Sequence, residues 1–166
     1  MTGVVEKRWV AVYANSELIQ VETNSGYRGG LPDPLGKRFE LVNSVADDVL
    51  GRAVLDALAA SRFLHPHEHP DFFDIRGRVV PQYEEWVKVM MANYGYKTRR
   101  ALFKNMKSCS IEERDGEITI RPTHHEKLEA WSGSGISDDS LVCVGSIDGP
   151  TVVGAALRLA LSRCTG

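Results

Sequence analysis

Short segments in which hydrophobic and polar residues alternate open the chain and return near its middle. Trp9–Tyr13 and Leu18–Val21 are rich in β-branched and aromatic residues and are separated by a polar Asn-Ser pair, which predicts a β-hairpin. Cys109–Glu113 and Glu117–Arg121 flank an Asp-Gly pair, a strong signal for a second hairpin. Two more short apolar runs are predicted strands, the second of them buried: Phe39–Val42 and Leu141–Val144.

Longer segments repeat their apolar residues at the spacing of a helix. The predicted helices are Val49–Ala59, Pro81–Tyr94 and Thr151–Ser162, with a shorter one at Lys97–Lys104 and a single helical turn from Thr123 through Trp131. Glycine, proline and polar residues between them predict loops at Thr23–Gly36 and Ser132–Ser140 and an irregular segment at Arg62–Val80.

A weak internal repeat relates two parts of the chain. Phe39–Val42 and Leu141–Val144 are each followed by a polar turn, a glycine and a helix of small residues. We interpret these as two strand–helix units that pack similarly on one sheet, although two Ala/Leu-rich helices can also match by chance. Gly51 and Gly154 lie inside the helical patterns, where glycine costs up to about 1 kcal/mol relative to alanine. A close approach of each helix to the sheet would justify that cost.

The length indicates one domain over residues 1–166. The predicted elements indicate an α+β fold, with helices packed on a mixed, mostly antiparallel sheet of about five or six strands, the usual sheet size. The net charge of −2 gives no sign of a nucleic-acid partner. Three cysteines form no disulfide or zinc pattern, and Cys109 and Cys143 are expected to be buried in the core. Neither a signal peptide nor an apolar run of about 20 residues is present, so we expect a cytoplasmic protein with no membrane partner.

Alternating histidines form the most obvious candidate metal site. His65, His67 and His69 would share one side of an extended segment, as a small metal-dependent hydrolase would require. A zinc site, however, needs fixed ligands supported by a surrounding hydrogen-bond shell, and a proline-rich loop supplies none by itself. A solvated loop is therefore the favoured interpretation, and we expect no metal and no cofactor.

Basic and aromatic residues interleave over residues 94–107. Five positive charges without an acid accompany Tyr94, Tyr96 and Phe103, whose rings could stack on bases, so an RNA-binding module is one interpretation of this segment. A solvated helix face, with its aliphatic stems lying over the core, is the simpler alternative. Contact with an acidic protein partner is the third.

Strings of residues spread over nearly the whole chain carry a family resemblance. They are Arg8–Tyr13, Gly95–Thr98, Ala101–Cys109, Pro122-Thr123, Lys127–Gly133 and Gly154–Cys164. In them the chain resembles the immunity proteins of contact-dependent growth inhibition systems, the CdiI family. The resemblance implies a cytoplasmic, non-enzymatic protein without catalytic residues. It implies a partner, the C-terminal toxin domain of a secreted CdiA-type effector, which is often a nuclease, and no direct contact with nucleic acid.

A toxin-binding surface cannot be transferred from the family residue by residue, so we predict one from charge. Because many nucleases have a basic cleft, a cognate inhibitor would place carboxylates and aromatic anchors opposite it. The candidates are Asp71, Phe72 and Asp74 in the irregular segment, and Asp138, Asp139 and Asp148 in and after the second loop. For Phe72 the favoured alternative is that it pins its own loop to the core.

Overall fold

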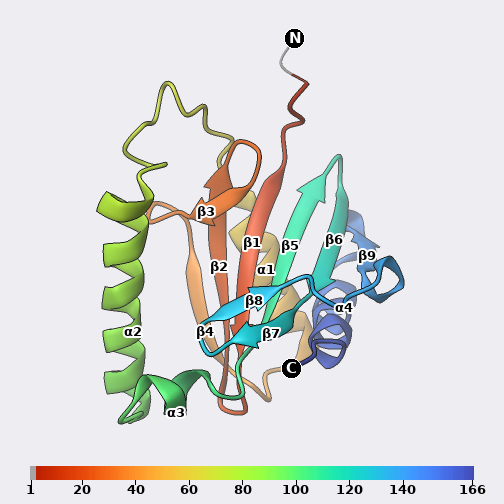
Figure 1. Ribbon diagram of the computed structural model, residues 1–166. Coiled ribbons are helices and arrows are strands. Elements are labelled where there is room, and N and C mark those ends of the chain that lie inside the picture. Colours follow the sequence, from red (N-terminus) through yellow and green to blue (C-terminus); the bar gives the residue numbers. More distant parts are fainter. Residues whose placement is uncertain (1–2) are drawn as a thin grey trace.

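The computed structural model describes residues 3–166 and arranges them in three layers (Figure 1). The middle layer is a seven-stranded sheet of order β3-β2-β1-β5-β6-β9, in which β4 also pairs with β2 and every paired strand is antiparallel. Its strands are β1 (Arg8–Ala14), β2 (Leu18–Gly26), β3 (Gly30–Pro32), β4 (Arg38–Val42), β5 (Lys107–Arg114), β6 (Glu117–Pro122) and β9 (Val142–Gly145). The predicted α+β class is confirmed, with slightly more strands than expected.

Two helices, α1 (Asp47–Ala59) and α4 (Pro150–Ser162), cover one face of the sheet. Alternation along the strands directs Val10, Val12 and Ile111 toward these helices, where they form the larger core with Leu50 and Leu157. The predicted pair of strand–helix units is therefore present, and both helices lie on the same face.

Gly51 of α1 and Gly154 of α4 allow a close contact between the two helices, whereas we expected each to allow a close contact between its helix and the sheet. A Cβ atom on Gly51 would overlap the carbonyl oxygen of Pro150, and one on Gly154 would overlap the carbonyl oxygen of Asp47. Each glycine thus lies against the backbone four residues before the other, so the two helices cross backbone to backbone in a symmetric way. The close approach is helix on helix, rather than helix on sheet.

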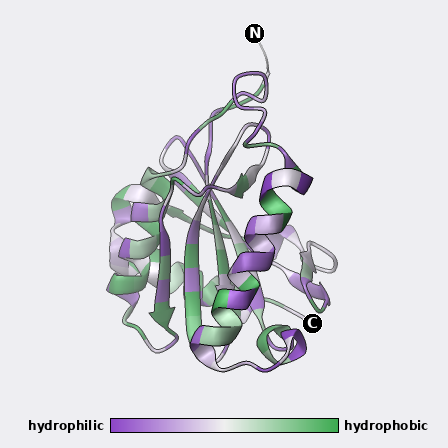
Figure 2. Ribbon diagram, turned by 90° about the vertical axis from the view of Figure 1, so that its left-hand side faces the viewer, coloured by the Kyte–Doolittle hydropathy of each residue, from purple (hydrophilic) through white to green (hydrophobic). Residues whose placement is uncertain are grey.

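The opposite face of the sheet carries α2 (Val80–Tyr94), α3 (Arg99–Phe103) and a small separate hairpin of β7 (His124–Lys127) and β8 (Ala130–Ser132). Viewed from the side of α2, this layer and the α1/α4 layer lie on either side of the sheet (Figure 2). A second core of Leu18, Trp86, Met90, Leu102 and Phe103 fills the space beneath α2 and α3. Both faces of the sheet are therefore buried, although on this side only in part.

Three sequence predictions are wrong in detail. Thr23–Gly36 is not wholly a loop, because β2 continues to Gly26 and pairs with β3. The stretch from Thr123 through Trp131 is a hairpin rather than a helical turn, and His125 stacks on Trp131 across it. Cys143 is exposed, because β9 is the edge strand and its alternation turns this side chain outward.

The irregular segment between α1 and α2 is irregular as predicted and ends in one π-helical turn, Ile75–Val79. α2 then starts at Val80 with Pro81 in its first turn, where the missing N–H leaves no hydrogen bond unmade. Gly95 ends the helix in a left-handed conformation, with φ of 72°. Within residues 3–166, none of the helices combines the length and apolarity that a membrane span requires.

Candidate functional site

A cavity of about 670 Å³ lies between α2 and the side of the sheet formed by β1, β2 and β4. We call it the α2 groove, and its walls include Tyr13, Glu22 and Arg38 from the strands and Tyr83, Trp86 and Val89 from the helix. Its volume is within the range of small-molecule and peptide pockets. The groove exists because Trp86 and Val87 turn into the second core while Val89 stays 42% exposed, so one face of α2 is left without a partner.

The floor of the α2 groove is a chain of buried polar groups. The indole Nε1 of Trp86 donates to Gln20 Oε1 at 2.6 Å, and the Gln20 amide donates to Glu22 Oε2 at 3.3 Å. Arg38 Nη2 pairs with Glu22 Oε1 at 2.7 Å. Burial and the charge of Glu22 raise the pKa of Tyr13 to about 12. The groove therefore offers apolar walls above a fixed line of hydrogen-bonding groups, which favours binding over proton transfer at neutral pH.

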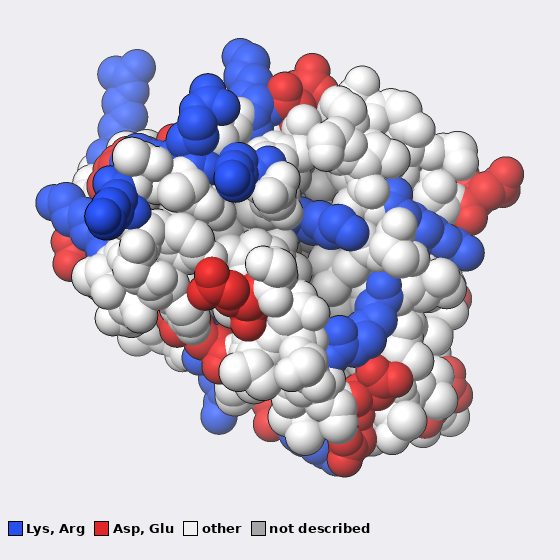
Figure 3. Space-filling view, turned by 90° about the horizontal axis from the view of Figure 1, so that it is seen from below, with Lys and Arg blue, Asp and Glu red and all other residues white. Residues whose placement is uncertain are grey.

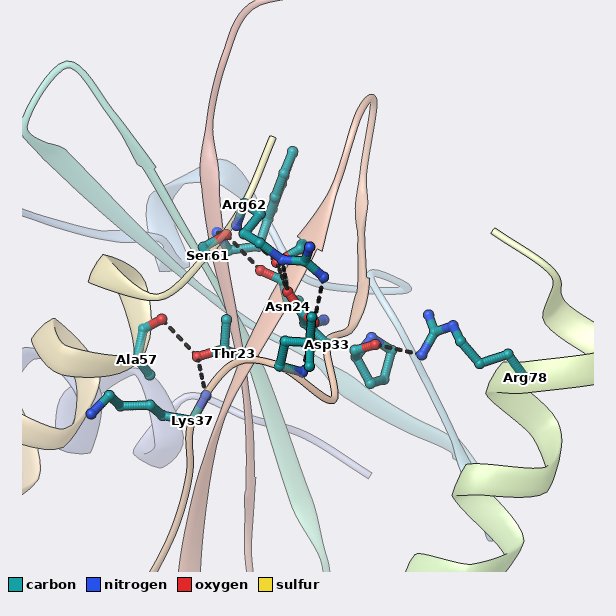
Figure 4. Close-up of polar contacts among 12 residues, drawn as sticks. Thr23, Asn24, Asp33, Lys37, Ala57, Ser61, Arg62 and Arg78 are labelled. Atoms are coloured by element: carbon teal, nitrogen blue, oxygen red, sulfur yellow. Dashed lines mark hydrogen bonds and ion pairs between the residues drawn. The ribbon is translucent and has the colours of Figure 1, made fainter. Parts of the chain in front are cut away.

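One end of the α2 groove is closed by the fully buried carboxylate of Asp33 (Figure 4). Arg62 binds it in bidentate fashion, with Nε and Nη2 at 2.8 and 2.9 Å from the two oxygens, and Ser25 donates its hydroxyl at 2.6 Å. Burial alone would raise the pKa of Asp33, but these donors and the Leu35 N–H outweigh it and hold the pKa below its usual value. This cluster joins β2, the β3–β4 connection and the segment after α1.

Arg78 attaches the irregular segment to the same end of the groove. It donates to the carbonyl oxygens of Phe72 and Pro32 at 2.7 and 2.8 Å, and its guanidinium lies 4.2 Å from the centre of the Phe72 ring. Figure 4 shows Arg78 reaching from the helical side toward the β3–β4 connection. Desolvation lowers the pKa of Arg78. The start of α2 is thereby fixed relative to the sheet, which sets the width of the groove.

The six predicted contact residues fall into two groups at opposite edges of the sheet. Phe72 is buried between Arg62 and Arg78, so it pins its loop to the core, while Asp71 and Asp74 are exposed beside it. Asp74 also accepts a hydrogen bond from the Gly77 N–H. The other three lie beyond the far edge strand β9: Asp138, Asp139 and Asp148. Five strand spacings of about 4.8 Å make the sheet between β3 and β9 roughly 24 Å wide, and the two groups lie toward its opposite edges.

The histidine segment does not have the extended form that the metal interpretation needs. The backbone turns at His65, whose carbonyl accepts from the N–H groups of Glu68 and His69, so the three imidazoles no longer share one side. His65 instead packs on Tyr27 and Phe63, with a ring separation of 4.6 Å from Tyr27. In the part of the chain that the structure describes, no three His, Cys, Asp or Glu side chains come close enough to hold an ion.

The basic segment 94–107 does not present its aromatic rings to solvent as a base-stacking surface. Phe103 is fully buried, and the hydroxyls of Tyr94 and Tyr96 are bound to Glu40 and Asn15. Arg99 is occupied by Glu84 and Glu129, at 2.7 and 2.5 Å. Seen from the end of the molecule that contains α3, several basic side chains gather on one side of this face, and acidic side chains lie beside and below them (Figure 3). The solvated helix face is the interpretation that these contacts support.

Sequence reasoning missed most of the α2 groove, because its residues come from four separate segments. The one available signal was the alternation of the polar residues Gln20, Glu22 and Glu40 with the apolar residues Ile19, Val21, Phe39 and Leu41. Such a pattern indicates a sheet face that is covered incompletely.

The chain matches one known protein family over almost its entire length. The sequence model of the CdiI family, described as CDI immunity protein, matches residues 8–164. The immunity protein CdiI-YPIII of Yersinia pseudotuberculosis serotype O:3 (strain YPIII) is 47% identical, and the match covers all of both chains.

Two solved structures have the same fold. One is a chain of the CdiA-CT/CdiI toxin and immunity complex from Y. pseudotuberculosis, with 46% identity, a TM-score of 0.91 and coverage of 98% of this chain and 99% of that one. The other is a protein of unknown function from Neisseria meningitidis, with 38% identity, a TM-score of 0.87 and coverage of 99% of both chains.

Proposed function

Because the chain belongs to the CDI immunity protein family, we propose that it binds and neutralises the C-terminal toxin domain of a cognate contact-dependent growth inhibition effector. It acts by stoichiometric occlusion and performs no catalysis, in the cytoplasm, where its three unpaired cysteines stay reduced. The toxin it blocks is a nuclease. The observation that carries the proposal is the likeness to the immunity chain of a toxin–immunity complex, at a TM-score of 0.91.

The α2 groove is the part of the surface that we propose receives the toxin. An apolar side chain of the toxin would pack against Trp86 and Val89, and polar groups beside it would meet the Glu22–Arg38 pair on the floor. Aromatic residues in well-packed pockets supply most of the energy in typical protein interfaces. The fixed position of α2, set by Arg78 and Asp33, means that little conformational entropy is lost when the groove fills.

The acidic residues remain candidates for steering the toxin toward the inhibitor. Asp71 and Asp74 are on the segment that joins the groove at Arg78, whereas Asp138, Asp139 and Asp148 lie beside β9, at the other edge of a sheet roughly 24 Å wide. A standard interface of about 800 Å² per partner is roughly 30 Å across. An interface that includes both acidic groups would therefore have to cover a whole face of the molecule. Charge changes in each group separately will show which one the toxin meets.

The test is a calorimetric titration of the toxin domain encoded immediately upstream, with its enzymatic activity assayed in parallel. We expect one-to-one binding that abolishes the activity. Absence of binding at micromolar concentrations would refute the immunity function itself.

A matched pair of variants tests the groove separately. Val89→Arg places a charge in the α2 groove, and we expect it to weaken binding at least tenfold. Leu159→Arg is the control, because Leu159 is similarly exposed, at 45% against 42%, but lies on α4 at the opposite face. If both variants bind like the wild type, the toxin uses another surface, and the immunity function stands without the groove.

A further inference from the structure

Two cysteines that are distant in sequence meet beneath the C-terminus. Cys109 lies in β5, and Cys164, 55 residues later, is the second residue after the end of α4; their sulfur atoms are 3.7 Å apart. The third cysteine, Cys143, is exposed on the edge strand β9 near Thr119. The immunity function proposed above uses none of the three thiols.

The two thiols of the pair differ in access. Cys164 lines a surface cavity of about 170 Å³, together with Lys107, Thr123 and His125, in the region where the C-terminus lies beside β7 (Figure 1). Cys109 is 1% exposed and does not line this cavity. A small oxidant can therefore reach Cys164 first, and Cys109 is the only thiol within reach behind it among the described residues.

The surroundings of the two thiols shift their pKa values in opposite directions. Hydrogen bonding from Cys109 and the charge of Lys107 lower the pKa of Cys164, whereas hydrogen bonding to Cys164 and burial raise the pKa of Cys109. The protonated Cys164 thiol also donates to the carbonyl oxygens of Ser108 and Ala160, at 3.4 and 3.6 Å. Low thiol pKa, partial exposure and an adjacent second cysteine are the properties that distinguish oxidation-sensitive thiols from structural ones.

We propose that Cys164 and Cys109 are a peroxide-sensitive modification site, with Cys164 as the attacking thiol and Cys109 as the resolving thiol. The Cys164 thiolate attacks one oxygen of hydrogen peroxide and the O–O bond breaks. The leaving hydroxide takes up one proton and departs as water, and Cys164 becomes a sulfenic acid. The Cys109 thiol then attacks the oxidised sulfur and releases a second water as the disulfide forms. Peroxide is the two-electron oxidant, and a cellular dithiol reductant restores both thiols.

The two sulfur atoms need only a short movement to reach bonding distance. The sulfurs must close from 3.7 Å to about 2.05 Å, and Cys164 lies outside the last turn of α4, so its side chain can move without unwinding the helix. The product links α4 covalently to the sheet. Disulfides of this kind in the cytosol are usually transient and redox-sensing, because the pool of thiols keeps the ground state reduced.

The experiment exposes the folded, reduced protein to hydrogen peroxide and then maps its thiols by alkylation and peptide mass spectrometry. We expect a disulfide between Cys109 and Cys164, a loss of two hydrogens in mass, a raised Tm, and full reversal by dithiothreitol. The variant Cys143→Ser is the matched control and should oxidise in the same way. In Cys109→Ala, which lacks the resolving thiol, a sulfenic acid on Cys164 should persist and react with dimedone.

Three results would overturn the proposal. One is modification of Cys143 while Cys109 and Cys164 remain open to alkylation. Another is a disulfide that forms only after unfolding in urea. The third is a Cys109→Ala protein that is folded by circular dichroism and yet gives no dimedone adduct. The first two results are read from thiol mapping of the wild-type protein and need no variant. The proposal is therefore tested even if Cys109→Ala folds poorly.

Discussion

Replacing Asp33 by asparagine tests whether the cluster at the end of the α2 groove stabilises the fold. The carboxylate accepts four hydrogen bonds, two of them from Arg62, and its side chain is fully buried. Removing one partner of a buried ion pair costs about 3–5 kcal/mol. Arg62 is 37% exposed, so water solvates part of the charge that is left, and we expect a loss of about 2–3 kcal/mol in the free energy of unfolding.

Urea denaturation of Asp33→Asn at pH 7 measures this loss, which corresponds to about 5–10 °C in Tm for a domain of this size. Because the pKa of Asp33 is lowered in the folded state, the carboxylate stabilises the protein above its unfolded pKa of about 3.9 and ceases to do so as the pH falls through the folded pKa. The difference between wild type and variant should therefore shrink below about pH 4. A variant within about 0.5 kcal/mol of the wild type, or a difference that does not change with pH, would contradict the reasoning. The exposed Asp139→Asn is the control.

Three further predictions concern other parts of the molecule. Gly154→Ala should lower the free energy of unfolding by about 2–3 kcal/mol in urea titrations, because its Cβ meets the Asp47 carbonyl, whereas Gly133→Ala, with open space around it, should not. Tyr13 should stay protonated to about pH 12 in an ultraviolet titration, and its contribution to stability, complete below about pH 10, should disappear as the pH rises through 12. If the titration curve of Tyr13→Phe matched that of the wild type, the result would be inconsistent with this prediction. Treatment with EDTA should leave Tm unchanged, because the imidazoles of the histidine segment do not converge. A fall in Tm would show that the protein binds a stabilising metal ion and would contradict this prediction.

Elements that depend on local signals could be predicted from the sequence, and those that depend on distant partners could not. The β5–β6 hairpin is local: Asp115 and Gly116 take the positive φ values of 51° and 81° that such a turn requires. The β7–β8 hairpin is not, because the tail of the chain helps to hold it, through the hydrogen bond from the His125 N–H to the Thr165 carbonyl. A search for helical spacing therefore assigned the wrong structure there.

The same distinction explains the candidate site. Local composition placed Asp71 and Asp74 in an irregular segment, and both side chains are exposed there. Their contact with a toxin stays a prediction. The α2 groove depends on how far α2 lies from the sheet, and that distance is set by Arg78 and by the Asp33 cluster, whose members come from three parts of the chain. No periodicity in one segment encodes such a separation.

The symmetric crossing of α1 and α4 also determines when the protein can begin to act. α1 is complete at residue 59, but the surface that covers it arrives only with residues 150–162, the last helix to be synthesised. At about 5–20 residues per second, translation leaves Leu50 and its apolar neighbours uncovered for roughly 5–20 s. A chain that stops before Pro150 lacks half of the larger core's helical layer, so we expect shortened products to give a cell no partial protection. Immunity then depends on the number of finished chains.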